Sequence, residues 1–109
     1  MSAAALALAD VRSPRLLELH YQAVLFGWSA RLHTDATWST DDGVVTDESA
    51  TFERTKPADV TLHVFASRAG QPDETIGGVA RIGLAPVVTR LFDNFAPIAV
   101  ALHELAVAS

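Results

Sequence analysis

The chain has 109 residues, half of them hydrophobic, with no cysteine and a formal net charge of −5. This length fits a single domain, and the apolar content excludes an intrinsically disordered chain. The missing cysteines exclude disulfides, thiol nucleophiles and cysteine-based zinc sites. Basic residues scattered along an acidic chain argue against nucleic acid or an anionic membrane as a partner. We therefore expect one α+β domain over residues 1–109, with residues 1–12 as a flexible N-terminal segment.

The N-terminal residues lack the full pattern of a secretory signal. Residues 3–9 are apolar and end in Ala-Leu-Ala, which resembles a cleavage site, but the run is short and no basic residue precedes it. No stretch reaches the roughly 18 apolar residues that a membrane-spanning helix needs. These features predict a cytoplasmic protein.

Residues 13–27 carry the signals of a helix. Ser13 can cap the first turn, Pro14 suits the first helical position, and Gly27 can end the helix. Five apolar residues then share one helical face: Leu16, Leu17, Tyr21, Val24 and Leu25. The alternative is a strand, because alternate positions from 17 to 25 are also apolar. The capping residues favour the helix.

Residues 28–54 predict antiparallel strands. The apolar residues at alternate positions are expected on one face of a long half-buried strand: Trp28, Ala30, Leu32, Ala36 and Trp38. Residues 39–43 have the composition of a turn, and residues 44–46 and 50–54 are weaker strand segments. The two tryptophans are expected either to pack in the core or to line an apolar groove for a peptide or ligand.

Residues 59–84 predict a second hairpin. Val60, Leu62, Val64 and Ala66 alternate with His63 and Phe65, so the first set is expected inside and the second outside. Residues 68–74 contain a glycine and a proline and have the length of a hairpin connection. Residues 75–84 are expected to return as a strand, which three glycines weaken.

The remaining residues predict a helix. Five apolar residues keep helical spacing: Val87, Val88, Leu91, Phe92 and Phe95. Pro97 is expected to break or kink this helix, with Asp93 or Asn94 as a second cap. Residues 98–107 are apolar on almost every side, and a helix of that kind must be buried. Since one small domain has difficulty surrounding it, a second subunit is expected to supply the missing cover.

The order of elements predicts an α+β fold: an N-terminal helix, an antiparallel sheet of three to five strands, and a kinked C-terminal helix packed on the sheet. Strands followed by a buried helix that begins at Ala96-Pro97 are similar to the SecB-type export chaperones. The resemblance implies apolar grooves of an oligomer that bind unfolded segments. That family's chains continue well past residue 109, and its motifs do not align residue by residue, so no membership is assigned.

Four residues are candidates for a weak polar site: His33, His63, His103 and Glu104. The first two lie on the polar faces of predicted strands, and could hold a metal or respond to pH if those strands were neighbours. The last two resemble the start of the zincin motif, and Thr75–Ala80 resembles the edge strand of metzincin peptidases, but Val107 stands where the second zinc ligand belongs. We expect solvated side chains, and we assign no catalytic residue, metal or cofactor.

These features favour a non-catalytic oligomeric binding or assembly module, with a protein or peptide partner and in the first place another copy of the chain. The candidate interface residues are large and apolar: Trp28, Trp38, Phe65, Leu91, Phe92, Phe95, Ile98 and Leu102. One alternative is a small enzyme or ligand-binding domain with a pocket between sheet and helices, in which His33, His63 or Asp35 acts as acid or base. A second is an acidic inhibitor or decoy that uses residues 35–53.

Overall fold

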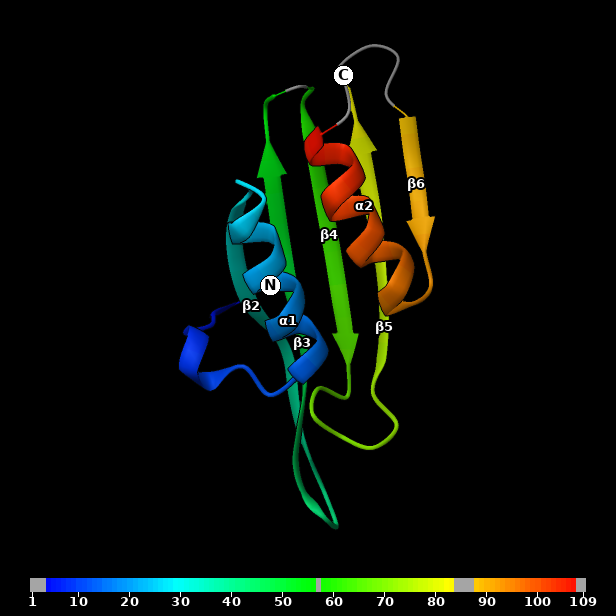
Figure 1. Cartoon of the computed structure of the whole chain (residues 1–109). Helices are drawn as coiled ribbons and strands as arrows, with labels where there is room; N and C mark the ends of the chain where they lie inside the picture. The colour runs from blue at the N-terminus through cyan, green and yellow to red at the C-terminus, as the bar shows by residue number, and fades with distance from the viewer. Residues whose placement is uncertain (1–3, 57, 84–87, 108–109) are drawn as a thin grey trace.

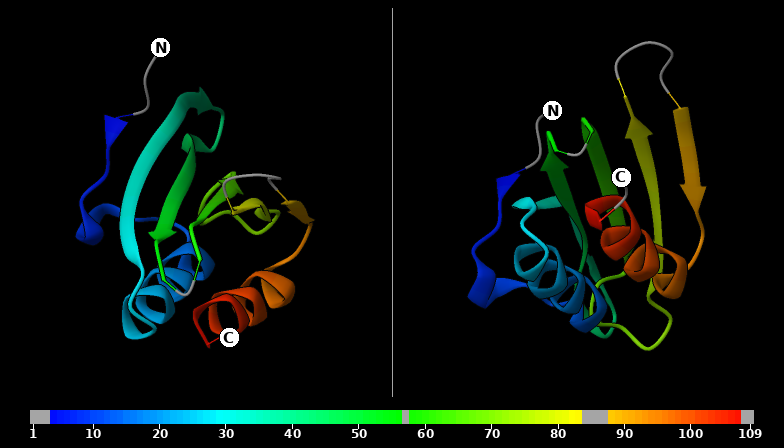
Figure 2. Two further views of the ribbon diagram at one scale, coloured as in Figure 1. Left: turned by 90° about the horizontal axis from the view of Figure 1, so that it is seen from above. Right: turned by 45° about the horizontal axis from the view of Figure 1, so that its top comes forward.

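A computed structural model describes residues 4–56, 58–83 and 88–107 (Figure 1). In chain order the elements are β1 (Ala4–Ala5), the 3-10 helix η1 (Leu8–Asp10), α1 (Pro14–Leu25), β2 (Ser29–Thr40), β3 (Gly43–Arg54), β4 (Val60–Ser67), β5 (Thr75–Ile82), β6 (Val88–Phe92) and α2 (Phe95–Val107). The strands form one antiparallel sheet in the order of the sequence. Both helices lie side by side on the same face of that sheet (Figure 2). The predicted α+β class is confirmed, and the very short β1 adds a strand to the five that were the upper expectation.

The start of α1 is fixed by the residues that predicted it. The Ser13 hydroxyl accepts a hydrogen bond from the Leu16 amide at 3.1 Å, and Pro14 occupies the first turn. Gly27 follows the helix with φ +86°, a conformation that glycine adopts without strain. The inward side of α1 buries Leu16, Leu19 and Ala23, so the predicted apolar face is wrong in part, since Tyr21, Val24 and Leu25 are exposed. These findings confirm the helix and exclude the strand alternative.

The hairpin of β2 and β3 contains a bulge that the sequence pattern did not reveal. Thr34 pairs with Glu48, but Ala36 pairs with the adjacent residue Asp47, so one extra residue is inserted in β2. The extra residue turns the following side chains to the other face of the sheet. The prediction that Trp28 and Trp38 share a face is therefore wrong. The two predicted strand segments of β3 are one continuous strand of 12 residues.

The segment before α2 differs from the sequence prediction. Residues 88–92 form strand β6 along β5, although their apolar spacing predicted a helix. Pairing with β5 decides the conformation there, and the β-branched Val88 and Thr89 suit a strand. Val87 lies outside the described residues. Pro97 falls in the first turn of α2, where its missing N–H breaks no helical bond, so the helix begins there as one continuous element instead of kinking.

The core lies between the helix layer and the covered face of the sheet. Its largest fully buried apolar side chains come from both layers: Leu16, Leu19, Phe52, Leu62, Val64, Ile98 and Leu102. Gly78 allows α2 to approach the sheet, because a Cβ atom there would lie 2.9 Å from the His63 carbonyl oxygen and 3.4 Å from Cδ1 of Ile98. The outward side of α2 leaves Val100 and Val107 exposed. No helix in the described ranges is long and apolar enough to cross a membrane.

Two buried carboxylates attach the start of α1 to the sheet. Glu48 of β3 is only 2% exposed and accepts hydrogen bonds from the Arg12 and Ser13 amides at 2.9 to 3.1 Å. Glu74 accepts from Nε of Arg15 at 3.1 Å and from the Gly70 amide at 2.8 Å. Glu48 occupies an inward position of β3, in alternation with Ala50 and Phe52. Its buried role could therefore have been predicted from that alternation.

Candidate functional site

The face of the sheet opposite the helices carries the exposed apolar side chains of the central and last strands. We call it the open face, because no described element covers it (Figure 2). Strand pairing places Phe65 beside Gly77, and Val79 between His63 and Leu91. Phe65 is 48% exposed and Leu91 is 79% exposed. Phe65, Val79 and Leu91 are defined here as the apolar half of the open face.

The other half of the open face, over residues 29–35 of β2 and 49–53 of β3, is polar, and its groups bond to one another, whereas beyond the bulge Trp38 pairs with Val45 on this face. Arg31 forms an ion pair with Glu53, and the Ser49 hydroxyl donates to the Asp35 carboxylate at 3.0 Å. The Thr51 hydroxyl lies 3.2 Å from Nδ1 of His63. These contacts satisfy the polar side chains locally. The apolar half lacks comparable partners among the described residues.

The structure does not bring His33 and His63 together. β3 lies between their strands, with His33 opposite Ser49 and His63 opposite Thr51. Two strand spacings, about 10 Å, separate their strands, and the Thr51 hydroxyl of the intervening strand contacts Nδ1 of His63. Within the described ranges no group of three His, Cys, Asp or Glu side chains gathers around a point that could hold a metal.

His103 and Glu104 lie on the exposed side of α2. The imidazole of His103 packs edge-on against Phe26, which follows α1, with ring centroids 5.1 Å apart. This contact joins the ends of the two helices. The structure places neither residue beside another of the predicted polar candidates.

The predicted interface residues divide into buried and exposed sets. Trp28, Phe92, Ile98 and Leu102 pack in the chain's own core, and Phe95 packs against its margin. Nε1 of Trp28 also donates a hydrogen bond to the Leu102 carbonyl oxygen at 3.0 Å, which ties β2 to α2. Trp38, Phe65 and Leu91 remain exposed. Of the predicted interface residues, only these three are therefore available to another molecule.

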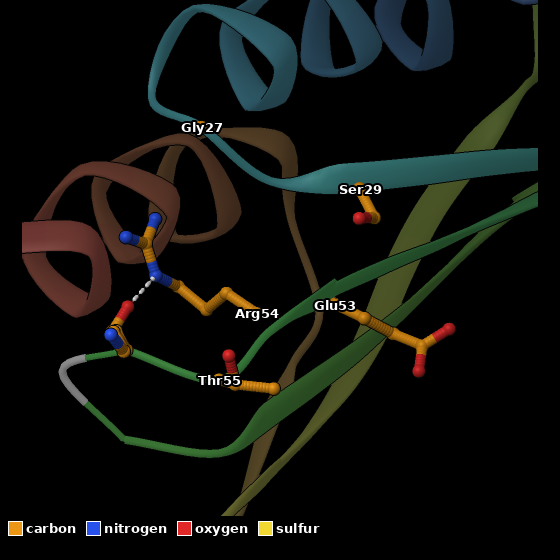
Figure 3. A pocket seen from close by; sticks show the side chains of 6 residues that line it. Gly27, Ser29, Glu53, Arg54 and Thr55 are labelled. Carbon is orange, nitrogen blue, oxygen red and sulfur yellow. Dashed lines mark hydrogen bonds between the residues drawn. The ribbon is translucent and has the colours of Figure 1, made fainter.

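A surface pocket of about 410 Å³ lies where β2 begins and β3 ends (Figure 3). Its most prominent side chain, Arg54, points from β3 towards α2, whereas Glu53 points to the other side of the sheet. Arg54 donates to the Phe26 carbonyl oxygen at 2.9 Å and stacks over the Trp28 ring at 5.2 Å. These contacts give Arg54 a structural role. Sequence reasoning missed it, since its partners are distant in the chain.

A second pocket of about 380 Å³ lies between the N-terminal segment and the bulged hairpin. It is lined by Leu6, Asp10, Arg12, Thr34, Thr37, Thr46 and Glu48. A third, of about 130 Å³, lies beside Phe65. None of these three pockets is lined by a histidine. They provide no setting for the histidine-dependent chemistry considered from the sequence.

The acidic residues between positions 35 and 53 do not form one continuous surface. Glu48 is buried against α1, and Glu53 pairs with Arg31. Asp47 accepts a hydrogen bond from the Arg68 amide at 3.0 Å. These three carboxylates are thus used inside the chain, which does not favour the decoy hypothesis.

The fold and the open face define the chain as a two-layer α+β domain with one uncovered sheet surface. No protein family, curated protein or solved structure matches this chain. The chemistry of its own surfaces is therefore the basis on which a function can be proposed.

Proposed function

We propose that the chain is a non-catalytic assembly module that binds protein, in the first place a second copy of itself, through the open face and margin of its sheet. The observation that carries this proposal is the apolar half of the open face. Phe65, Val79 and Leu91 are neighbours on paired strands and lie on a surface that no described element covers. Removing apolar surface from water favours association by about 25 cal/mol per Å².

The outward side of α2, on the opposite side of the molecule from the open face, is a second apolar surface for a protein partner. Val100 and Val107 are exposed there, while Ile98, Ala101 and Leu102 fill the inward side. The chain thus covers only one side of its most apolar helix. Exposed apolar groups gathered on specific surfaces commonly mark protein interaction sites.

The polar half of the open face favours a structural role over catalysis. Its side chains already form the Arg31–Glu53 ion pair and the Ser49–Asp35 hydrogen bond. A catalytic acid or base needs a partner that activates it within reach of a substrate site. The contacts of these residues are explained by the stability of the sheet alone.

Size-exclusion chromatography with light scattering tests the proposal. We expect a dimer at micromolar concentration, and we expect Leu91→Ser to raise the dissociation constant about tenfold or more, since it removes the most exposed apolar side chain of the apolar half, on the last strand of the sheet. Val44→Ser is the matched control, because Val44 is 47% exposed but belongs to the face of β3 that carries Glu48. A monomeric wild-type chain that also binds no apolar dye would contradict the proposal.

A further inference from the structure

Strand β6 is the least covered strand of the sheet's five longer strands. Among the described residues it pairs with β5 on one side and ends the sheet on the other (Figure 1), and of its five residues only Phe92 is buried. Val88 is 52% exposed and Leu91 is 79% exposed, and the two residues between them are also exposed. An edge strand without lysine or proline is a ready template for pairing with another strand, and the one charged side chain of β6, Arg90, is engaged over the Phe92 ring of its own strand.

The opposite edge of the sheet is protected. β1 pairs with β2 at His33 and Thr34, and the Leu6 amide donates to the Leu32 carbonyl oxygen at 2.9 Å. Further along, β2 bends at its bulge and carries the charged Asp35. Bulges and charges are the devices by which proteins prevent edge pairing. The chain therefore protects one edge of its sheet and leaves the other open.

The outward backbone groups of β6 can be identified. The Phe92 carbonyl oxygen lies on the β5 side, since a Cβ atom added to Gly77 would approach it to 3.2 Å. Alternate residues of an antiparallel strand direct their N–H and C=O groups to opposite sides. Thr89 and Leu91 therefore direct theirs away from β5, towards the free edge.

We infer that β6 pairs antiparallel with β6 of a second copy, with the two Leu91 residues opposite each other, so that two sheets become one. This inference rests on the proposed function, and it identifies the surface of self-association. A second copy is the fitting occupant because each chain has one open edge. Pairing through that edge is isologous and closes at two copies, instead of continuing as a filament.

The register follows from the side chains. Leu91 opposite Leu91 extends the apolar half of the open face across the joint, with Val79 on either side. The alternative with Arg90 at the centre would place two like charges opposite each other, which destabilises a strand pair. In the Leu91 register, Arg90 faces Phe92 of the second copy, the ring type on which it already stacks within its own chain, 5.3 Å from the centroid.

Single cysteine variants test this register cleanly, because the chain has no cysteine of its own. Directly opposite residues of a hydrogen-bonded pair have Cα atoms about 5.5 Å apart, which is within the range of a disulfide. We therefore expect Leu91→Cys to form a covalent dimer under mild oxidation, seen on a non-reducing gel. Thr89→Cys is the matched control, since the two copies of residue 89 would lie roughly 13 Å apart, about four residues of rise.

The outcomes separate the two proposals. A wild-type dimer in which Leu91→Cys stays unlinked would overturn the β6 joint while the proposed assembly function stands. If Thr89→Cys chains crosslink only with Leu91→Cys chains, residue 89 lies opposite residue 91 and the strand pair is centred on Arg90. That result would overturn the proposed register. A wild-type chain that is monomeric up to high micromolar concentration would overturn both. Circular dichroism checks that each variant keeps the fold.

Discussion

The two faces of the sheet contain the same alternation of side chains, yet only one is covered. On the covered face, Phe52, Leu62 and Val64 are fully buried beneath two helices. On the open face, the neighbouring positions of the same strands hold Thr51, His63 and Phe65. The comparison shows that β3 and β4 supply the core from one face, whereas on the other face Phe65 is 48% exposed and Thr51 is only 8% exposed. Stability should therefore depend on the covered face, and association on the open face.

The largest expected effect comes from a substitution on the covered face of the sheet. Phe52→Ala removes a fully buried ring from β3 and should lower the free energy of unfolding by about 3–5 kcal/mol. Phe65→Ala, on the adjacent strand but the open face, should lower it by less than about 1 kcal/mol. Urea unfolding of both variants, at a concentration where the wild type is monomeric, measures the contrast. Equal losses of unfolding free energy would contradict the prediction that stability depends mainly on the covered face.

A second, smaller effect concerns the buried carboxylate. Glu48→Ala leaves the Arg12 and Ser13 amides without their acceptor, and should cost about 2–3 kcal/mol of unfolding free energy. Glu53→Ala breaks the exposed ion pair with Arg31 and should cost about 1 kcal/mol or less. Thermal unfolding followed by circular dichroism compares them. A larger loss for Glu53→Ala than for Glu48→Ala would contradict the structural role of Glu48.

A third prediction concerns how closely the helix layer packs on the sheet at Gly78. Gly78→Ala adds a methyl group 2.9 Å from the His63 carbonyl oxygen, so β5 or Ile98 must shift. We expect a loss of about 1–3 kcal/mol, typical of overpacking. Combining it with Ile98→Val, which removes one methyl group of the packed side chain, should recover part of that loss if the helix contact contributes. If Ile98→Val recovers none of the lost stability, the whole loss comes from the contact of the added methyl group with the backbone of β4.

Local patterns predicted the parts of this fold that local chemistry decides. The Ser13-Pro14 cap located α1 within a residue, and the alternation from Val60 to Ala66 gave both the strand and its inward side. The same reasoning missed β6, because Val88, Leu91 and Phe92, which keep helical spacing, lie in a strand that pairs with β5. The conformation of residues 88–92 depends on pairing with β5, which the spacing of apolar residues within the segment does not reveal.

The candidate site was less predictable for a related reason. Which side chains share a face depends on register, and the bulge beside Thr34 separated Trp38 from the residues it was grouped with. His33 and His63 were expected to meet only if their strands were neighbours, and the order of strands placed β3 between them. Phe65 and Leu91 were identified as interface candidates, but only the sheet pairing brought both to one open surface.

The smallest expected effect is a pH dependence that belongs to the helix layer. Burial lowers the pKa of His20 below its usual value of 6.5, and its Nδ1 is buried without a hydrogen-bond partner among the described residues. The unfolded chain therefore binds a proton at His20 more readily than the folded chain does. Stability is full above about pH 6.5 and falls as the pH drops through the lower folded-state pKa.

The midpoints of urea unfolding at pH 7.5 and pH 5.5 measure how much the stability of the chain depends on pH. The ring of His20 is only partly buried and touches Tyr21 edge-on, so we expect a modest shift between the two pH values. His20→Gln removes the titrating group and should reduce the difference between the two midpoints. A difference that survives His20→Gln unchanged would contradict the assignment of this pH dependence to His20.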